Sequence, residues 1–404
     1  MCRENQTLLR TQEEHDRQVD QIENAVGRRK DELRTGYGIN RKTALTLIEG
    51  FHPLLSTPPD LVHDDWLGIC VRTTKLFLRE ICFTLQLISL DDLNGRITDF
   101  DYGYTEKSEK PSPISQKHVI DMNEGFKQTA AQMAQLVTML PLIISDKVPE
   151  GLLALENYLK MIEYILISHA DTINSSILDY LSRCISGYLE TFEAAYNEHL
   201  TPKQHFLLHR VAAILRYGPL QNYKTMRAEA FHQVSKRMAQ CLLTYKNLPL
   251  TLAKKHQLRE AFILQGDLGR EMTKGPSKWV PIDAIIYQDL FPDVRRLQIA
   301  NWVMINGIKY VPLKCFLATG YSEENLPEFV VLHAIVWRNE NPIFVCRTVT
   351  TVEHNMILMS YEVKINEQYV SLTYNDLLTP DVFHGHRWIN KQYIIIKKAL
   401  GNLH

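Results

Sequence analysis

Residues 200–259 read LTPKQHFLLHRVAAILRYGPLQNYKTMRAEAFHQVSKRMAQCLLTYKNLPLTLAKKHQLR, and this stretch decides how the chain is organised. It holds eleven lysines and arginines but a single acid, Glu229, whereas the whole chain has a formal net charge of −1. Phosphate neutralisation supplies most sequence-independent affinity for nucleic acid, so a confined basic region predicts a polyanion-binding face. The cations expected to contact nucleic acid are Lys203, Arg210, Arg216, Lys224, Arg227, Lys236, Arg237, Lys254 and Lys255.

The local pattern predicts two helices around a tight break. Thr201 is a suitable cap for a helix whose first turn holds Pro202, where the missing N–H of proline does no harm. That helix is expected to run to about Tyr217 and to end at Gly218-Pro219. A second helix is expected from about residue 223 to residue 245, because its apolar residues recur at helical spacing. The stretch therefore predicts a basic helical hairpin over residues 200–265.

Glu229 is the exception within this basic stretch. No lysine or arginine stands three or four residues away from it, so an ion pair along one helix does not explain its presence. Two interpretations stay open. Glu229 is either a solvated surface glutamate or a metal-binding carboxylate beside a phosphate-binding surface.

Upstream, residues 58–65 read PPDLVHDD and also have two interpretations. Two prolines force an extended entry, and Asp60 is well placed to cap a helix that begins at Leu61. Asp64 and Asp65 would then lie in the first turns, where the helix dipole favours anions. The functional alternative places Asp60 and His63 one turn apart on the same face, as metal ligands or as residues that support a ligand.

These two blocks resemble transposases of the CACTA (En/Spm) kind, in particular the divergent copies scattered through animal genomes. The family pattern is Leu-Thr-Pro-Lys-x-His-Phe, then Tyr/Phe-Gly-Pro-Leu, then Met-Arg-x-Glu-Ala, and residues 200–233 are similar to it. The run YGINRKTALTLIEGFHPLLSTPPDLVHDDWLGI, from Tyr37, looks like the family's Pro-Pro-Asp-x-x-His-Asp block and its approach. The resemblance covers about Leu9 to Arg259.

The resemblance implies an RNase H-like nuclease as the parent enzyme. Two aspartates and one glutamate would hold two divalent ions, Mg²⁺ or Mn²⁺, across the scissile phosphate. Glu229 matches the family's glutamate and is the candidate catalytic residue. Asp60, His63 and Glu229 are the candidate metal ligands. Asp60 and His63 fall in an accessory block, so the two catalytic aspartates are expected upstream of Met1. The chain is therefore expected to be a partial, inactive copy with an incomplete acidic triad.

The remaining segments predict an α+β protein, mainly helical in its N-terminal two thirds. A polar helix is expected over residues 1–35, within an N-terminal block of residues 1–69. Residues 70–199 resemble the family's helical insertion, with a loop at 91–117 and helices near 119–144, 150–169 and 175–199. Residues 266–281 are a linker by composition. Residues 282–404 alternate in polarity between Asn-Gly and similar turns, which predicts a small antiparallel β-barrel.

Composition narrows the class of protein. Hydrophobic residues make up 45% and charged residues 23% of the chain, as in ordinary globular proteins. No apolar run reaches the length of a membrane span, and the N-terminus has no signal-peptide pattern. Seven widely spaced cysteines without a Cys-x-x-Cys pair indicate neither a disulfide framework nor a zinc knuckle. The expected location is the nucleus, or the cytoplasm before import.

Three functions stay open from the sequence. The first is a transposase-derived DNA-binding protein whose parent cleaved and transferred strands, with Mg²⁺ or Mn²⁺ as cofactor if it is active. The second is a domesticated, non-catalytic protein that binds chromatin, nucleic acid or other proteins. The third is a helical scaffold whose basic face is incidental. DNA is the expected partner, a homo-oligomer is an alternative assembly, and no membrane or small-molecule cofactor is expected.

Overall fold

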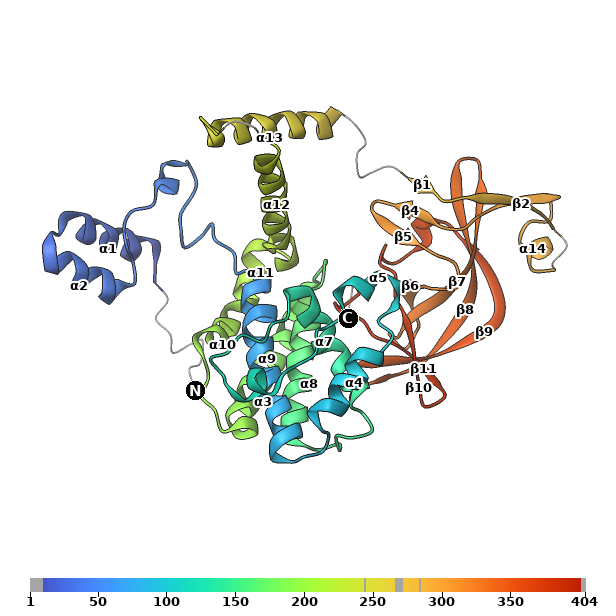
Figure 1. The fold of residues 1–404 in the computed structure, drawn as a ribbon, viewed down its shortest axis with the longest axis horizontal. Coiled ribbons are helices and arrows are strands. Elements are labelled where there is room, and N and C mark those ends of the chain that lie inside the picture. Colours follow the sequence, from blue (N-terminus) through green and yellow to red (C-terminus); the bar gives the residue numbers. More distant parts are fainter. Residues whose placement is uncertain (1–9, 243–244, 266–271, 283–284, 401–404) are drawn as a thin grey trace.

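The chain folds as an α+β protein in which a helical body precedes an antiparallel sheet (Figure 1). The computed structural model describes residues 10–242, 245–265, 272–282 and 285–400. The α+β prediction is confirmed. The helices before the sheet are α1 (Gln12–Asn24), α2 (Gly27–Tyr37), α3 (Cys70–Arg79), α4 (Leu90–Asp99), α5 (Gly103–Glu106), α6 (Gln116–Ile120), α7 (Ala130–Ile143), α8 (Leu153–Ser168), α9 (Leu178–Tyr196), α10 (Pro202–Phe206), α11 (Arg210–Tyr217), α12 (Met226–Gln240) and α13 (Leu248–Gln265).

The central helix of the body is longer than α3 itself. Helical turns of the π type, Val62–Ile69 and Glu80–Thr84, extend α3 at both ends. Asp60 caps this helix as predicted, because its carboxylate accepts a hydrogen bond from the Val62 N–H at 3.1 Å. Leu76, Phe77 and Leu78 on α3 are buried in the core that α7, α8 and α9 share. The side chains of α3 therefore face helices that lie far away in the sequence.

Two sequence predictions within the body are wrong in their boundaries. The helix expected from residue 119 begins instead at α7, where Thr129 and Gln132 form a capping box. The preceding turn has a separate role, since the carbonyls of Asp121 and Glu124 accept hydrogen bonds from the buried Lys75 ammonium at 2.7 and 2.8 Å. The loop expected at 91–117 contains α4, because Ser89 caps that helix through the Asp92 N–H.

The N-terminal block also differs from expectation. Residues 1–9 lie outside the described residues, and the rest of the predicted single helix is split into α1 and α2. The chain passes from one helix to the other at Gly27, whose φ of +55° lies in the left-handed region that glycine adopts most readily. Thr11 caps α1 through the Glu14 N–H, as the sequence predicted.

The helices α12 and α13 form an arm that extends from the body (Figure 1). We call these two helices, residues 226–265, the basic arm. Figure 1 shows α12 rising from the body and α13 crossing its far end. No described side chain on either helix is buried, in contrast to α7, α8 and α9. The side chains of the arm are therefore available to a partner.

The C-terminal strands form an open sheet and not a barrel. The order of the larger sheet is β10-β11-β9-β8-β7-β3-β2, with β6 also paired to β7, and a small second sheet has the order β1-β4-β5. The barrel prediction is wrong because β10 and β2, at the two ends of the larger sheet, do not pair with each other. The strands are β1 (Thr273–Lys274), β2 (Ser277–Pro281), β3 (Arg296–Ala300), β4 (Val303–Ile305), β5 (Ile308–Tyr310), β6 (Phe316–Tyr321), β7 (Pro327–Arg338), β8 (Asn341–Asn355), β9 (Ser360–Leu372), β10 (Gly385–Trp388) and β11 (Lys391–Ile394), and the short helix α14 (Ile285–Leu290) lies between β2 and β3.

Local details of the sheet follow the sequence more closely. The predicted Asn-Gly turn joins β4 to β5, and Asn306 and Gly307 have φ angles of +50° and +81°, as a tight hairpin turn requires. In contrast, β1 and β2 fall within the predicted linker, whose residues 266–271 lie outside the described part. Leu358, Tyr393 and Ile395 join the helical core, so the sheet packs directly on the body.

A buried ion pair joins the two motif blocks inside the body. Arg210, the first residue of α11, donates from both terminal nitrogens to the carboxylate of Asp65, at 2.8 and 3.2 Å. His169 donates from Nε2 to the same carboxylate at 3.0 Å. Asp65 is 0% and Arg210 2% exposed. Burial raises the pKa of Asp65, but the Arg210 charge and the His169 hydrogen bond hold that pKa below its usual value.

Among the described residues, no helix is both long and apolar enough to cross a membrane. The six described cysteines, at positions 70, 82, 184, 241, 315 and 346, are free thiols. The packing of the body therefore depends on side-chain burial and on the Asp65–Arg210 pair, with no disulfide within the described part of the chain.

We expect Arg210→Met to destabilise the protein by about 3–5 kcal/mol, because it leaves the Asp65 carboxylate buried without its cation. The measurement is chemical unfolding followed by circular dichroism. The exposed Arg216 on the same helix is the matched control, and Arg216→Met should change the stability by less than about 0.5 kcal/mol. The double variant Asp65→Leu/Arg210→Met should recover most of the loss. Equal midpoints for Arg210→Met and Arg216→Met would show that the pair is not a structural constraint.

Candidate functional site: a carboxylate–histidine cluster at the base of a basic arm

Three residues predicted as metal ligands meet at the base of α12. His63 Nδ1 lies 2.5 Å from Asp60 Oδ2, and His63 Nε2 lies 3.3 Å from Glu229 Oε1. Asp60 and His63 belong to the first turn of the central helix, whereas Glu229 belongs to the first turn of α12. We call Asp60, His63 and Glu229 the acid–histidine cluster. The imidazole ring of His63 lies between the two carboxylates.

Asp60 also fixes the start of α12. Its two carboxylate oxygens accept hydrogen bonds from the Thr225 N–H at 3.2 Å and from the Thr225 hydroxyl at 2.6 Å. Partial burial raises the pKa of Asp60, but the hydrogen bonds from Thr225 and His63 outweigh it and hold the pKa below its usual value. Asp60 is therefore a charged anchor for both helices. The capping and functional interpretations of Asp60 are compatible with each other.

The tautomer of His63 decides what the cluster can bind. A carboxylate only accepts hydrogen bonds, so the Nδ1 contact with Asp60 places a proton on Nδ1. Nε2 then faces Glu229. Nε2 either carries a second proton, which it donates to Glu229, or offers a lone pair that binds the same cation as the Glu229 carboxylate. A metal-binding histidine usually donates its other nitrogen to a carboxylate, which orients the ring. His63 and Glu229 thus fit a metal ion as direct ligands.

Asp60 does not fit as a third direct ligand, because it contacts the opposite nitrogen of the same ring. The prediction that Asp60, His63 and Glu229 together ligate a metal is therefore corrected for Asp60, which orients His63 instead. The side chains of His63 and Glu229 are 50% and 54% exposed, so water or phosphate oxygens can reach a cation held there. An imidazole nitrogen paired with a carboxylate suits Zn²⁺ or Mn²⁺ better than Mg²⁺, which prefers oxygen ligands.

The exposed cations lie on and beside the basic arm. Among the described residues, no ion pair joins a carboxylate to the five cations named below, so their charge is available to an outside anion, whereas Arg259 of α13 pairs with Glu260 at 3.4 Å. Lys236 stands two helical turns beyond Glu229, which places it on the same face of α12 as the cluster. The exposed cations of the predicted set are Arg216, Lys236, Arg237, Lys254 and Lys255.

Four other cations of the predicted set are placed differently. Arg210 is buried against Asp65, so the prediction that it contacts nucleic acid is wrong. Lys203 is half-buried, and its ammonium group donates a hydrogen bond to the His63 backbone carbonyl at 2.6 Å. Lys203 thereby helps to fix the backbone of the cluster. Lys224 is half-buried and lines a cavity. The side chain of Arg227 lies outside the part of the chain that the structure describes.

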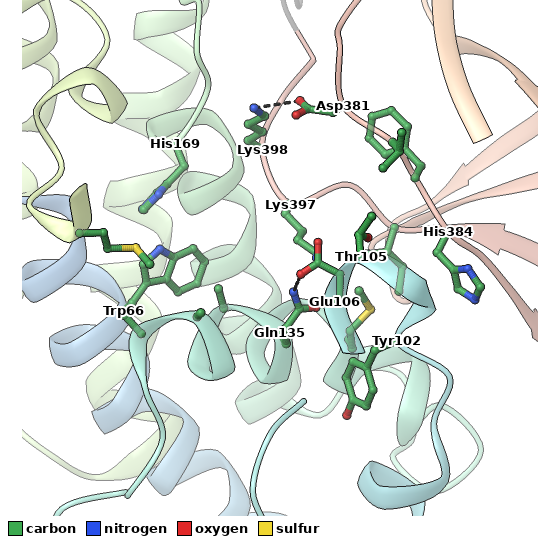
Figure 2. A pocket seen from close by; sticks show the side chains of 18 of the residues that line it. Trp66, Tyr102, Thr105, Glu106, Gln135, His169, Asp381, His384, Lys397 and Lys398 are labelled. Atoms are coloured by element: carbon green, nitrogen blue, oxygen red, sulfur yellow. Dashed lines mark hydrogen bonds and ion pairs between the residues drawn. The ribbon is translucent and has the colours of Figure 1, made fainter. Parts of the chain in front are cut away.

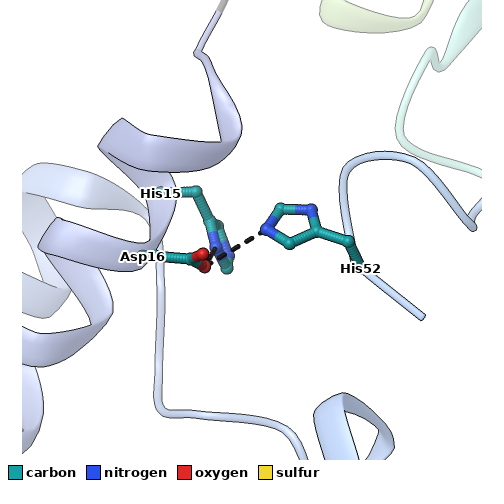
Figure 3. A group of neighbouring side chains, drawn as sticks. All are labelled: His15, Asp16 and His52. Atoms are coloured by element: carbon teal, nitrogen blue, oxygen red, sulfur yellow. Dashed lines mark hydrogen bonds and ion pairs between the residues drawn. The ribbon is translucent and has the colours of Figure 1, made fainter. Parts of the chain in front are cut away.

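A second group of possible metal ligands lies in the N-terminal block (Figure 3). Asp16 Oδ1 lies 3.1 Å from His15 Nδ1 and 3.2 Å from His52 Nε2. However, His52 Nδ1 accepts a hydrogen bond from the Leu54 N–H at 3.2 Å, so the proton of the neutral ring lies on Nε2 and points at Asp16. A metal at Nε2 would bring the Nδ1 proton against the Leu54 N–H. This group therefore fits a hydrogen-bonded clasp between α1 and the following loop better than a metal site.

Neither this clasp nor the Asp65–Arg210 pair is predicted by the sequence pattern. A His-Asp dipeptide such as His15-Asp16 is too common to indicate a partner at His52. Asp65 could not be distinguished from Asp64 by position, since both follow the same cap. The pair is visible only after folding, when one of the two carboxylates turns into the core.

We expect the unsubstituted protein to bind Mn²⁺ at the cluster. Both His63→Ala and Glu229→Gln should abolish that binding. Asp60→Asn should weaken it by about 10–100-fold, because the ring loses the carboxylate that orients it. Isothermal titration calorimetry with Mn²⁺, repeated with Zn²⁺, is the measurement. His52→Ala is the control from the second group and should bind as the parent does. No heat of binding for either ion, or a loss confined to His52→Ala, would contradict this assignment.

The geometry can be set against known proteins. Comparison with protein-family models, with curated proteins and with solved structures finds no match to this chain. The resemblance to transposases therefore stays a prediction.

Proposed function

We propose that this chain is a transposase-derived nucleic-acid-binding protein that contacts phosphates through its basic arm. The observation that carries the proposal is the set of exposed cations on α11, α12 and α13 that have no ion-pair partner among the described residues, together with the acid–histidine cluster at the base of α12. Cations of this kind release condensed counterions when they meet a phosphate backbone, which gives affinity without sequence preference. Such a protein acts on DNA in the nucleus, alone or as a homo-oligomer.

The position of the cluster supports a metal ion shared with a phosphate. A divalent ion held by His63 and Glu229 keeps coordination positions open, and phosphate oxygens are suitable ligands for them. Lys236 and Arg237 would attract the same phosphates from further along α12. The ion would thereby link the arm to the backbone of a bound strand.

The alternative function is a non-catalytic interaction scaffold. The observation that favours it is the apolar exposure of α13, where Leu258, Phe262 and Leu264 are 70%, 66% and 83% exposed. Large apolar side chains gathered on one element are typical of a protein-binding surface. Nucleic-acid binding accounts for the cations, whereas a protein partner accounts for these three residues.

We expect the variant Lys236→Glu/Arg237→Glu/Lys254→Glu/Lys255→Glu to bind duplex DNA more weakly and with a smaller salt dependence. Each lost phosphate contact should reduce the slope of log K against log salt by about 0.9. Fluorescence anisotropy at several salt concentrations gives both values.

The matched control reverses four exposed cations of the sheet region, Lys278, Arg296, Lys314 and Lys364. This variant has the same net charge as the arm variant but should keep most of the affinity and slope. Equal losses in the two variants would show that only overall charge matters, and the arm would not be the binding surface.

We also expect the chain not to cleave DNA with Mg²⁺ or Mn²⁺. In-line displacement by two metals needs charge compensation at both the attacking and the leaving oxygen, through several shared carboxylates. The cluster supplies one direct carboxylate, Glu229, because the Asp60 carboxylate is engaged by His63 and Thr225. The assay is nicking of supercoiled plasmid, with Glu229→Gln as the control. Metal-dependent nicking by the parent and not by Glu229→Gln would make Glu229 catalytic.

A further inference from the structure

A cavity of about 290 Å³ lies where the helical body meets the C-terminal segment of the sheet (Figure 2). Figure 2 shows Trp66 and His169 on the helical side and Asp381, Lys397 and Lys398 on the opposite side. Trp66 and His169 have ring centroids 4.8 Å apart at a tilt of 51°. The volume is close to that of small-ligand pockets, which combine apolar walls with a few placed polar groups.

Two buried side chains that line this cavity each carry a polar atom without a hydrogen-bond partner among the described residues. Gln135 donates from Nε2 to the Glu106 carboxylate, which fixes the orientation of its amide and leaves Oε1 as an unpartnered acceptor. His386 stacks on Phe100, and its Nδ1 also has no partner. Gln135 is 3% and His386 4% exposed. Each such atom costs about 1–3 kcal/mol when it is left unpaired in the interior.

The neutral form of His386 has two tautomers, and our proposal uses the one with its proton on Nε2. Burial lowers the pKa of His386 to about 3, so the ring is neutral near pH 7 and carries a single proton. In the tautomer that carries this proton on Nε2, the unpartnered Nδ1 is an acceptor. Gln221, which also lines the cavity, contributes a third buried oxygen without a partner. These unpartnered atoms therefore favour a ligand with several N–H donors.

The charged groups around the cavity already compensate one another. Lys397 pairs with Glu106 at 2.8 Å, and Lys398 pairs with Asp381 at 2.9 Å and with Asp171. A charged ligand would have to compete with these pairs, whereas an uncharged one would not. The aromatic and aliphatic walls of the cavity, which include Trp66, Tyr102 and Met139, favour a ligand with a flat ring system.

We propose that this cavity binds a purine base through its N–H donor edge, with guanine the best match. Guanine presents an N1–H and an N2 amino group on one edge, and these can pair with Gln135 Oε1 and His386 Nδ1. The base can come from a free nucleoside or from a nucleic-acid strand. Val62 and Met226 line the cavity and are neighbours of His63 and Thr225, so the cavity adjoins the acid–histidine cluster. Binding of a free nucleoside does not depend on the proposed function of the arm.

The test is calorimetric titration of the full chain with guanosine, adenosine and uridine. We expect guanosine to bind, adenosine to bind less tightly and uridine to bind least. His386→Phe keeps the ring stacked on Phe100 but removes the acceptor, and should weaken guanosine binding by about ten-fold. Gln135→Met should weaken it as well. Tyr164→Phe is the matched control, because it removes a buried unpartnered hydroxyl outside the cavity and should leave binding unchanged.

A stability measurement separates loss of the site from loss of the fold. Without ligand, His386→Phe should raise the unfolding temperature or leave it unchanged, since it removes an unpaired buried acceptor. Absence of guanosine binding at millimolar concentration would overturn the proposal. Equal binding of all three nucleosides, or full binding by both cavity variants, would also overturn it.

The source of the base is tested with two oligonucleotides, an all-thymine strand and the same strand with one central guanine. If the base comes from a strand, the guanine-containing strand binds the parent more tightly, and His386→Phe removes that difference. If it comes from a free nucleoside, the two strands bind equally while guanosine still binds. Reversing the four arm cations should weaken both strands and leave guanosine binding intact, so failure of the arm and failure of the cavity are distinguishable.

Discussion

The buried pair between Asp65 and Arg210 is the interaction on which the rest of the helical region depends. An ion pair of this kind gains little over an apolar contact, but it is costly to break, so it specifies which segments meet. Here it joins the start of the central helix to the start of α11. Asp60 lies just before that point and Thr225 soon after α11, and a second contact between these two residues closes the arrangement. Two contacts thereby hold the two motif blocks together: the buried Asp65–Arg210 ion pair and the partly exposed Asp60–Thr225 hydrogen bond.

The placement of His63 and Glu229 follows from these two contacts. The Asp60 carboxylate contacts Nδ1 of His63 and also binds Thr225, the residue just before α12. Glu229 in the first turn of α12 therefore lies near Nε2, the other nitrogen of the same ring. A lone glutamate in a basic stretch then has a physical reason. It compensates a histidine or a cation at the base of an arm whose other exposed groups are positive. Lys203, bonded to the His63 carbonyl, adds positive charge next to the cluster and limits how strongly two ligands can hold a divalent ion.

Much of this architecture could be predicted from the sequence, but not its long-range pairing. The change from helical to alternating periodicity predicted strands after the helices, and Asn306-Gly307 gave a correct turn because the signal is local. Closure of the sheet depends on whether β2 meets β10, which no local pattern encodes. Charge counting placed Arg210 on the surface because it ignores burial. Spacing could pair Asp60 with His63 within one turn. Glu229 was suggested by its place as the single acid of the basic stretch and by the resemblance, and neither of these indicated its contact with His63.

One short segment, residues 220–229, connects the cavity with the acid–histidine cluster. Gln221, Lys224 and Met226 line the cavity, Thr225 is bonded to Asp60, and Glu229 faces His63. The cavity and the cluster therefore share one piece of backbone. A ligand in the cavity and a cation at the cluster would therefore contact the same short segment, from which the basic arm begins at Met226.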